Sequence, residues 1–136
     1  MSEPRTNHAV PLTDERLRTF WAERHLCTVS TLRPDGEIHV TPMGIVLDAD
    51  AGVAWGITSA ISVKARNLRA NPHIAVCQVD GRRWCSLNGT ATVHDDLETI
   101  AEAEQRYAGR YRTPRANPDR VAVVIDIHKV LANLPG

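Results

Sequence analysis

The chain has few aromatic residues and no apolar run that approaches the length of a membrane span. Among its 136 residues there are one Phe, two Tyr and three Trp. An apolar core therefore has to be built mainly from Val, Ile, Leu and Ala. A membrane-spanning helix needs about 20 consecutive apolar residues, and the first residues contain no apolar signal core. We expect a cytoplasmic protein that makes no membrane contact.

The chain also lacks an excess of charge of either sign. Its 16 Lys and Arg residues balance 16 Asp and Glu residues, whereas nucleic-acid-binding proteins usually have a basic excess. We therefore expect no nucleic-acid partner. Neither the three cysteines nor the six histidines have the spacing of metal ligands. We expect no metal site, and we interpret Cys27, Cys77 and Cys85 as small buried apolar side chains.

Short alternating runs separated by turn residues predict a mainly β fold with a few helices. Pro34-Asp35-Gly36, for example, is a tight turn between two such runs. We expect about six mostly antiparallel strands, a crossover helix in the middle and a helix near each end. A small barrel of this kind fills its interior with side chains, so a sizeable ligand has to bind outside it. Residues 1–11 are expected to form a flexible N-terminal arm, and residues 12–136 a single domain.

The segment that follows the third predicted strand is the best candidate for a ligand site. Ser59 and Ser62 precede or open a short helix that carries Lys64 and Arg66. The first N–H groups of a helix have no internal partners, and they lie at its positive end. With hydroxyl groups and a lysine nearby, such a helix start can hold a phosphate. The glycine-rich spacing of a P-loop is absent, and an ordinary crossover helix with a solvated basic face is an equal alternative.

Other residues indicate how a ligand could approach the barrel. Pro42 interrupts a strand, because it cannot donate to the ladder, and Gly56 leaves room for a close approach to its backbone. Trp84 and Ser86 share one face of a long strand. An outward-facing Trp is typical either of a ring stacked upon it or of a dimer contact.

The end of the last predicted helix is basic. Its arginines bind anionic groups, balance the negative end of the helix, or do both; they include Arg110, Arg112 and Arg115. No pattern of a nucleophile elbow is present, so the catalytic residues stay unknown.

Several stretches resemble a known group of enzymes. Ser62 to Pro72, together with the order of the elements, resembles the helix after the third strand in flavin and deazaflavin oxidoreductases of the pyridoxamine-phosphate-oxidase-like, split β-barrel superfamily. Gln78 to Leu87 and Arg106 to Arg115 resemble the branch that uses coenzyme F420, and within it the F420-dependent biliverdin reductases. The resemblance runs from about Leu12 to Leu131.

The resemblance implies a split β-barrel that forms a homodimer with cofactors in grooves at the subunit interface. The cofactor phosphate would lie at Ser59, Ser62 and Lys64, with Arg66 nearby. The other implied contacts are Thr41 and Pro42 along the deazaflavin, backbone contacts from Ile57 and Thr58, and Trp84 and Ser86 from the same or the partner subunit.

The same resemblance implies hydride transfer from F420H₂ to a conjugated acceptor, with the reduction of biliverdin to bilirubin as the best specific expectation. A tetrapyrrole carries propionates, which Arg110 and Arg112, or Arg115, could hold. No residue stands out as an obligatory general acid. Two alternatives stay open at this point: an FMN-dependent oxidase or reductase of the same fold, and a non-catalytic protein that carries F420 or a flavin.

Overall fold

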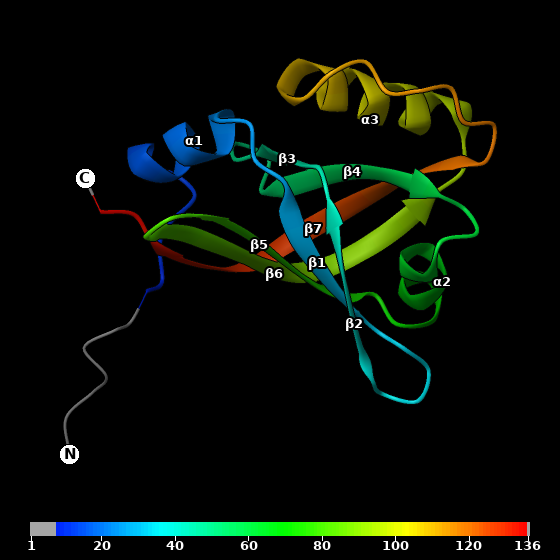
Figure 1. Ribbon diagram of the computed structural model, residues 1–136, viewed down its shortest axis with the longest axis horizontal. Coiled ribbons are helices and arrows are strands. Elements are labelled where there is room, and N and C mark those ends of the chain that lie inside the picture. Colours follow the sequence, from blue (N-terminus) through cyan, green and yellow to red (C-terminus); the bar gives the residue numbers. More distant parts are fainter. Residues whose placement is uncertain (1–7, 136) are drawn as a thin grey trace.

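The computed structural model describes residues 8–135, and within them the chain folds as one antiparallel sheet with three helices (Figure 1). The strands are β1 (Cys27–Leu32), β2 (Ile38–Met43), β3 (Ile45–Asp48), β4 (Val53–Ser59), β5 (His73–Asp80), β6 (Arg83–His94) and β7 (Arg120–Asn133). The helices are α1 (Glu15–Ala22), α2 (Val63–Ala70) and α3 (Leu97–Arg110). The predicted mainly β fold is therefore confirmed. The described residues contain one strand more than expected, because β3 is separate from β2.

The order of the strands explains why the sheet curls. Across the sheet the order is β2-β1-β5-β6-β7-β4-β3, so β2 and β3 are its two edges. Only Gly44 lies between them in the sequence, so both edges have to meet at this residue. The result is a split barrel rather than a closed one. The interruption expected at Pro42 occurs two residues later: Pro42 stays in β2 opposite Thr28, where an edge strand tolerates its missing N–H.

The core consists of the inward-facing aliphatic residues that the sequence pattern predicts. Val29, Leu87 and Ile125 are fully buried on three different strands. Each such side chain contributes about 1.5–3 kcal/mol when it is removed from water. Helix α1 closes one end of the barrel, as Figure 1 shows, and its buried residues are Leu17, Phe20 and Trp21.

The other face of β2, β1, β5 and β6 is open. Side chains that lie opposite one another in the ladder share this face, as the pairs Cys77–Ser86 and Val79–Trp84 illustrate. The predicted common face of Trp84 and Ser86 is therefore correct. Large apolar side chains remain uncovered there: Ile38 is 68% exposed, Val40 57% and Val79 59%. Apolar surface of this kind usually marks an interaction site.

The expected N-terminal arm lies partly outside the described residues, which begin at His8. Its last residues are hydrogen-bonded to the end of β7: the N–H of Ala132 donates to the His8 carbonyl at 2.8 Å, and the N–H of Val10 donates to the Val130 carbonyl at 3.2 Å. Within residues 8–135, none of the helices combines the length and the apolar character that a membrane crossing requires.

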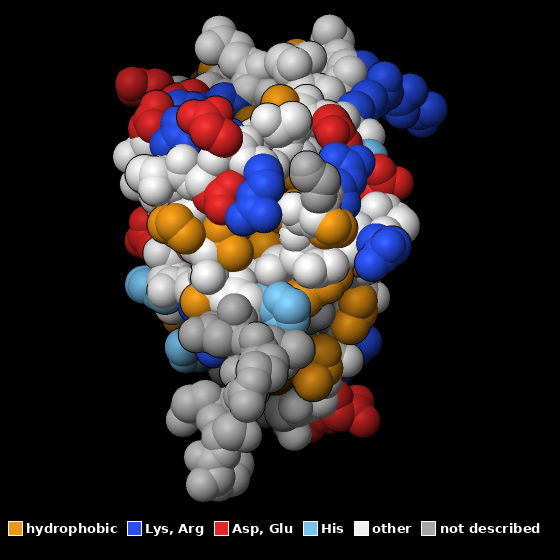
Figure 2. Space-filling model, turned by 90° about the vertical axis from the view of Figure 1, so that its left-hand side faces the viewer, with side chains coloured by type: hydrophobic (Ala, Val, Ile, Leu, Met, Phe, Trp, Pro, Cys, Tyr) orange, Lys and Arg blue, Asp and Glu red, His pale blue; other side chains and the backbone are white. Residues whose placement is uncertain are grey.

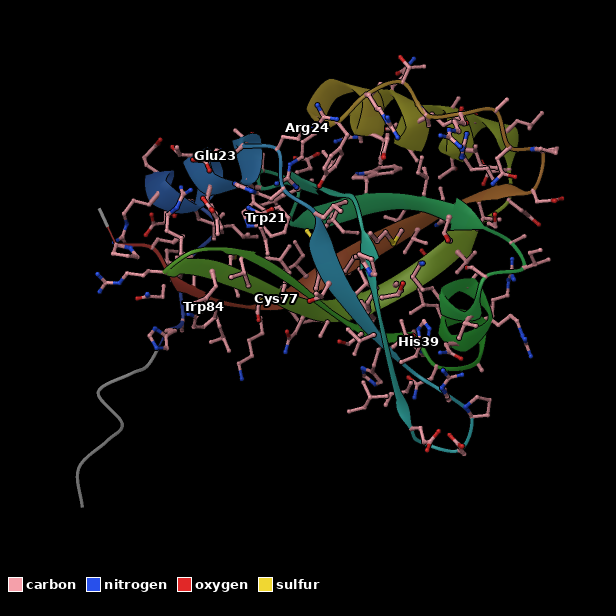
Figure 3. The ribbon with its side chains drawn as sticks, viewed as in Figure 1. Trp21, Glu23, Arg24, His39, Cys77 and Trp84 are labelled. Carbon is pink, nitrogen blue, oxygen red and sulfur yellow. The ribbon has the colours of Figure 1, made fainter. Side chains whose placement is uncertain are left out.

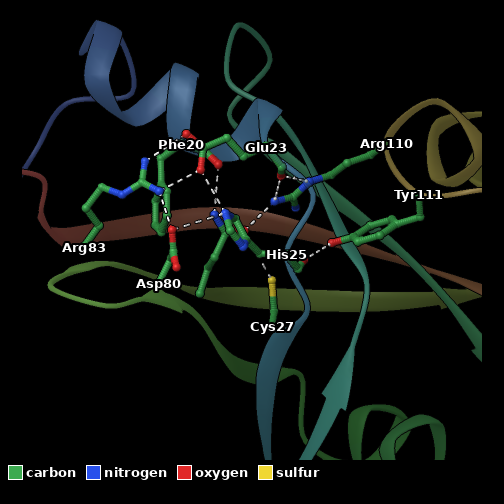
Figure 4. A network of polar contacts seen from close by, with 9 residues as sticks. Phe20, Glu23, His25, Cys27, Asp80, Arg83, Arg110 and Tyr111 are labelled. Atoms are coloured by element: carbon green, nitrogen blue, oxygen red, sulfur yellow. Dashed lines mark hydrogen bonds and ion pairs between the residues drawn. The ribbon is translucent and has the colours of Figure 1, made fainter.

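Arg110 is the last residue of α3, and all three nitrogens of its guanidinium group donate hydrogen bonds into the barrel (Figure 4). It donates to the Glu23 carbonyl at 3.0 and 2.7 Å and also to the Ile45 carbonyl and the Gln78 side-chain oxygen. Gln78 is fully buried and donates in turn to the Phe20 carbonyl at 3.0 Å. A single side chain of α3 thus connects the segment after α1 with β3 and β5.

Tyr111 completes this connection. Its hydroxyl donates to the His25 carbonyl at 2.6 Å and accepts from the N–H of Ile45 at 3.1 Å. The guanidinium of Arg110 also lies 5.0 Å from the ring centroid of Trp21 and 5.1 Å from that of Tyr111, where a cation is attracted to the ring. These contacts fix the end of α3 and therefore the start of the loop that follows it.

An ion-pair cluster lies beside this network. Arg83 donates two hydrogen bonds of 2.8 Å to the Glu23 carboxylate and another to Asp80. His25 contacts Glu23 at 2.9 Å. Figure 2 shows acidic and basic side chains next to one another at the α1 end of the molecule. Glu23, His25 and Asp80 lie close enough together to ligate a cation, but Arg83 already donates to the carboxylates of Glu23 and Asp80.

The cluster makes the stability of the protein depend on pH. The hydrogen bonds from Arg83, and then from His25, lower the pKa of Glu23 from about 4.5 to about 2. A carboxyl whose pKa is lower in the folded state adds stability above its unfolded pKa, and this stability is lost as the pH falls through the folded pKa.

We expect the wild-type chain to lose stability between about pH 4.5 and pH 2, and Glu23→Gln to lose less over the same interval. The free energy of unfolding in urea, measured at several pH values, checks this. Glu37→Gln is the matched control, because Glu37 is exposed in the turn before β2 and should keep the wild-type pH dependence. Parallel curves for Glu23→Gln and the wild type would contradict the assignment.

Candidate functional site

A cleft of about 360 Å³ opens where the ends of β2 and β4 meet the start of α2 and the loop after α3. It is lined by Pro42, Met43, Gly44, Ile57, Thr58, Ser59, Lys64, Tyr107, Arg112, Pro114, Arg115, Asn117 and Arg120. The cleft lies outside the packed interior, which agrees with the expectation that a small barrel binds its ligand on its surface.

Helix α2 presents its start to this cleft. Ser62 is its N-cap, and the Ser62 hydroxyl oxygen accepts from the N–H of Ala65 at 3.1 Å. The Thr58 hydroxyl donates to the same oxygen at 3.1 Å. Since the remaining N–H groups of the first turn have no helical partners and lie at the positive end of the helix, they favour an anion.

Lys64 adds a full positive charge at this point. Its side chain is half-buried, and burial lowers its pKa. Within residues 8–135, no acidic side chain pairs with it. A cation that has lost part of its hydration and has no counter-charge is stabilised by an anionic ligand.

The rest of the cleft is also basic. Arg112 and Arg115 are exposed on the loop after α3, and neither forms an ion pair within the described part of the chain. Arg120 differs, because it pairs with Glu104 at 2.7 Å. No Asp or Glu is among the lining residues, so the cleft attracts anionic groups.

One wall of the cleft is aromatic. Tyr107 and Tyr111 lie four residues apart on and just after α3, and their rings stack with centroids 5.0 Å apart. They pack onto the break between β2 and β3, where a Cβ on Gly44 would lie 2.9 Å from the Tyr107 ring. Only glycine allows the tyrosine rings to pack this close to the backbone. Gly44 therefore connects the two edge strands and also provides the surface on which the tyrosines pack.

The close approach expected at Gly56 comes from the protein itself. A Cβ on Gly56 would lie 2.5 Å from the terminal methyl carbon of Met43 and 3.1 Å from Ile45. The expected close approach to this backbone is therefore confirmed, and the groups that make it are core side chains.

The cysteines offer no nucleophile. Burial raises the pKa of Cys27 to about 12 and that of Cys85 to about 11, and it also raises the pKa of Cys77. The reactive form of cysteine is the thiolate, so these thiols stay protonated and inert near neutral pH. All three are free.

The structure brings most of the expected cofactor residues together. Five of them line the cleft: Pro42, Ile57, Thr58, Ser59 and Lys64. Arg112, which the sequence predicts to bind the substrate, lines it as well. Ser62 joins them through its hydrogen bond with Thr58.

The other expected residues do not line this cleft. Thr41 belongs to β2 and is half-buried, and Arg66 faces a separate hollow next to the turn between β1 and β2. Trp84 and Ser86 lie on the open sheet face; Figure 3 shows Trp84 at the opposite end of the sheet from α2. The guanidinium of Arg110 is engaged within the barrel.

Sequence reasoning missed several residues of the cleft wall. Tyr107 had a visible signal, because it lies four residues before Tyr111 on a predicted helix. Nothing in the sequence indicated Asn117 or Arg120, since only the path of the loop brings them to the end of β4. The hydrogen bond from Asn117 to Ser59, 2.9 Å long, fixes that path.

These residues fit a phosphorylated ring cofactor. The helix start, the two serines and Lys64 suit a phosphate, while Pro42, Met43 and Tyr107 offer an apolar surface to a flat ring. The fit follows from the chemistry of the lining residues, because an anion site and an apolar wall adjoin in a single cleft.

Comparisons with known proteins agree with this architecture. The family model for pyridoxamine 5'-phosphate oxidase matches residues 13–133. The F420H₂-dependent biliverdin reductase of Mycobacterium tuberculosis (strain CDC 1551 / Oshkosh) is 42% identical over 127 residues, which cover 93% of this chain and 92% of that protein.

Solved structures show the same fold. A conserved hypothetical protein of M. tuberculosis, Rv2991, superposes with a TM-score of 0.78 at 24% identity, over 96% of this chain and 89% of that one. A structure described as an F420 reductase gives a TM-score of 0.69 at 24% identity, over 83% and 94% of the two chains. Because the family model spans nearly the whole chain, the protein belongs to the pyridoxamine 5'-phosphate oxidase family.

Proposed function

We propose that the protein is a reductase that uses reduced coenzyme F420 and transfers a hydride to a tetrapyrrole, with biliverdin as the preferred acceptor. The structural observation that carries the proposal is Lys64, a half-buried cation at the start of α2 that has no acidic partner among residues 8–135. The identity of the coenzyme and acceptor is supported by the relative that is 42% identical over nearly its whole length.

The residues of the cleft divide the binding of the coenzyme between them. Ser59, Ser62 and Lys64 would hold its phosphoryl group, because they combine hydroxyl donors, the helix start and a positive charge. Pro42 and Tyr107 would lie against the deazaflavin, and Ile57 with Thr58 would supply backbone contacts. Arg66 and Thr41 would support this region from neighbouring positions.

When F420H₂ is bound, it supplies the hydride, and the protein positions and polarises the two partners. Arg112 and Arg115 point from the loop after α3 into the same cleft, where they would bind the propionates of the acceptor. Arg110 cannot share this task in the observed arrangement, because its donors are used by Glu23, Ile45 and Gln78. Its role is to hold the loop that carries the other two arginines.

We further propose that the working unit is a homodimer formed through the open sheet face. Pro42 lines the cleft, and its ladder partner Thr28 places it on the face that also carries Trp84 and Ser86. In one chain Trp84 and Ser86 lie away from the cleft, so a second copy on this face would bring them to it. A cytoplasmic location belongs to the same proposal, since free thiols persist in a reducing compartment.

Titration of the purified chain with F420 and with FMN, followed by fluorescence quenching, tests the choice of coenzyme. We expect F420 to bind more tightly than FMN, and Lys64→Met to weaken F420 binding at least about tenfold, because a hydrogen bond to a charged group is lost. Arg24→Met is the control, since Arg24 is exposed between α1 and β1. Adding biliverdin to the F420H₂ complex and following its absorbance then tests turnover.

Tighter binding of FMN would favour the flavin enzyme of the same fold, and binding of F420 without turnover would favour a carrier. An unchanged F420 affinity in Lys64→Met would contradict the phosphate site itself.

The dimer is tested by placing a charge on the open face. Val79→Arg should convert the wild-type dimer to a monomer and lower the affinity for F420, because Trp84 and Ser86 of the partner no longer complete the site. Sedimentation velocity measures the first effect and fluorescence titration the second. Leu97→Arg is the matched control, since Leu97 is 85% exposed but lies at the start of α3. A monomeric wild type, or a dimeric Val79→Arg, would refute the proposed interface.

A further inference from the structure

The loop between α3 and β7 reaches back to the end of β4 through one asparagine. The Asn117 amide nitrogen donates to the Ser59 hydroxyl oxygen at 2.9 Å. Next to it, the N–H of Ala60 donates to the Asp119 carbonyl at 2.8 Å, and Ser59 lies opposite Arg120 in the ladder. Asn117 and Ser59 both line the cleft, so this contact is part of its wall.

The orientation of the Asn117 amide is determined by the backbone. The N–H of Asp119 donates to the Asn117 side-chain oxygen at 2.9 Å, and a backbone N–H can only donate. The oxygen of the amide therefore faces Asp119, and its NH₂ group has to face Ser59. Because an NH₂ group can only donate, the Ser59 hydroxyl oxygen is the acceptor of this bond.

A serine hydroxyl has one hydrogen, and here that hydrogen is left without a protein acceptor. No other hydrogen bond of the Ser59 hydroxyl occurs within residues 8–135. Since the oxygen already accepts from Asn117, the hydroxyl hydrogen points away from Asn117 and is free to donate. The neighbouring Ser62 oxygen likewise accepts from the N–H of Ala65 and from Thr58.

We propose that Asn117 is a positioning residue that fixes the Ser59 hydroxyl as a hydrogen-bond donor to the phosphoryl group of the coenzyme. This inference rests on the proposed phosphate site and goes beyond it, because it assigns a role to a residue of the α3–β7 loop. The contact between this loop and the end of β4 thereby contributes to the affinity for a phosphorylated ligand.

A double-mutant cycle tests the inference with two ligands: F420 and the deazaflavin nucleoside that lacks the phosphoryl group. The variants are Asn117→Ala, Ser59→Ala and the combination of both, and the readout is the dissociation constant from fluorescence quenching. We expect each single variant to weaken F420 binding about five- to tenfold, which is the range for one lost hydrogen bond. The combined variant should be no weaker than the weaker single one, and nucleoside binding should stay unchanged.

Asn117→Asp provides a sharper change at the same position. It keeps the oxygen that accepts from the N–H of Asp119 but turns the Ser59 hydroxyl toward a carboxylate and adds a negative charge. We expect it to weaken F420 binding about thirtyfold or more, beyond the effect of the alanine variant. Asn71→Ala is the matched control. Asn71 forms a turn of the same kind at the far end of α2, where its side-chain oxygen accepts from the N–H of His73 at 3.1 Å, and the substitution should leave F420 affinity unchanged.

Two results would overturn the inference while leaving the proposed function intact. The effects of Asn117→Ala and Ser59→Ala could add independently, or nucleoside binding could fall as much as F420 binding; in either case Asn117 only shapes the loop. If the wild-type chain bound both ligands equally, the phosphate site would be wrong and this inference would fail with it. Unchanged melting temperatures of the variants show that each one is folded.

Discussion

The architecture depends on the hydrogen bonds that the guanidinium group of one arginine donates into the barrel. Arg110 ends α3, and its guanidinium donates to backbone carbonyls of Glu23 and Ile45 and to the fully buried Gln78. Hydrogen bonds from a charged donor are stronger than those between neutral groups. Because these bonds reach the segment after α1, β3 and β5 together, they hold α3 against the break in the split barrel. Because α3 and the loop after it form one wall of the cleft, the shape of the cleft depends on these hydrogen bonds.

The position of α3 then determines the chemistry of the cleft. Tyr107 forms an apolar wall above Gly44, and the loop that follows Tyr111 carries Arg112 and Arg115 toward the start of α2. On the opposite side, Lys64 has lost part of its hydration and meets no carboxylate of the part of the chain that the structure describes. The cleft is thus apolar where a ring would lie and positive where anionic groups would lie. This division is what a reductase needs when the hydride comes from a bound coenzyme.

The sequence was informative wherever the signal was local. Alternating runs and turn residues gave the mainly β fold, and the serines before Lys64 indicated the helix start that lines the cleft. The separate strand β3 was missed, because a break at Gly44 depends on the tyrosines of α3, which are distant in the sequence. Arg110 looked like a substrate ligand for the same reason: its charge is visible in the sequence, whereas its buried partner Gln78 is apparent only in the fold.

The contributions of Trp84 and Ser86 stay a proposal, since one chain places them on the open sheet face rather than in the cleft. Their common face followed from the alternation of a strand, which is a local property. Whether a second copy covers that face depends on the association of subunits, and no local pattern encodes it. The same holds for Asn117, whose contact with Ser59 arises from the path of a long loop.

A crystal structure of the chain with bound F420 tests the phosphate site most directly. The phosphoryl group is expected at the start of α2, within hydrogen-bond distance of the Ser59 and Ser62 hydroxyls and of the Lys64 ammonium group, with the deazaflavin beside Pro42 and Tyr107. A phosphoryl group bound elsewhere, with Lys64 extended into solvent, would contradict the assignment of this cleft.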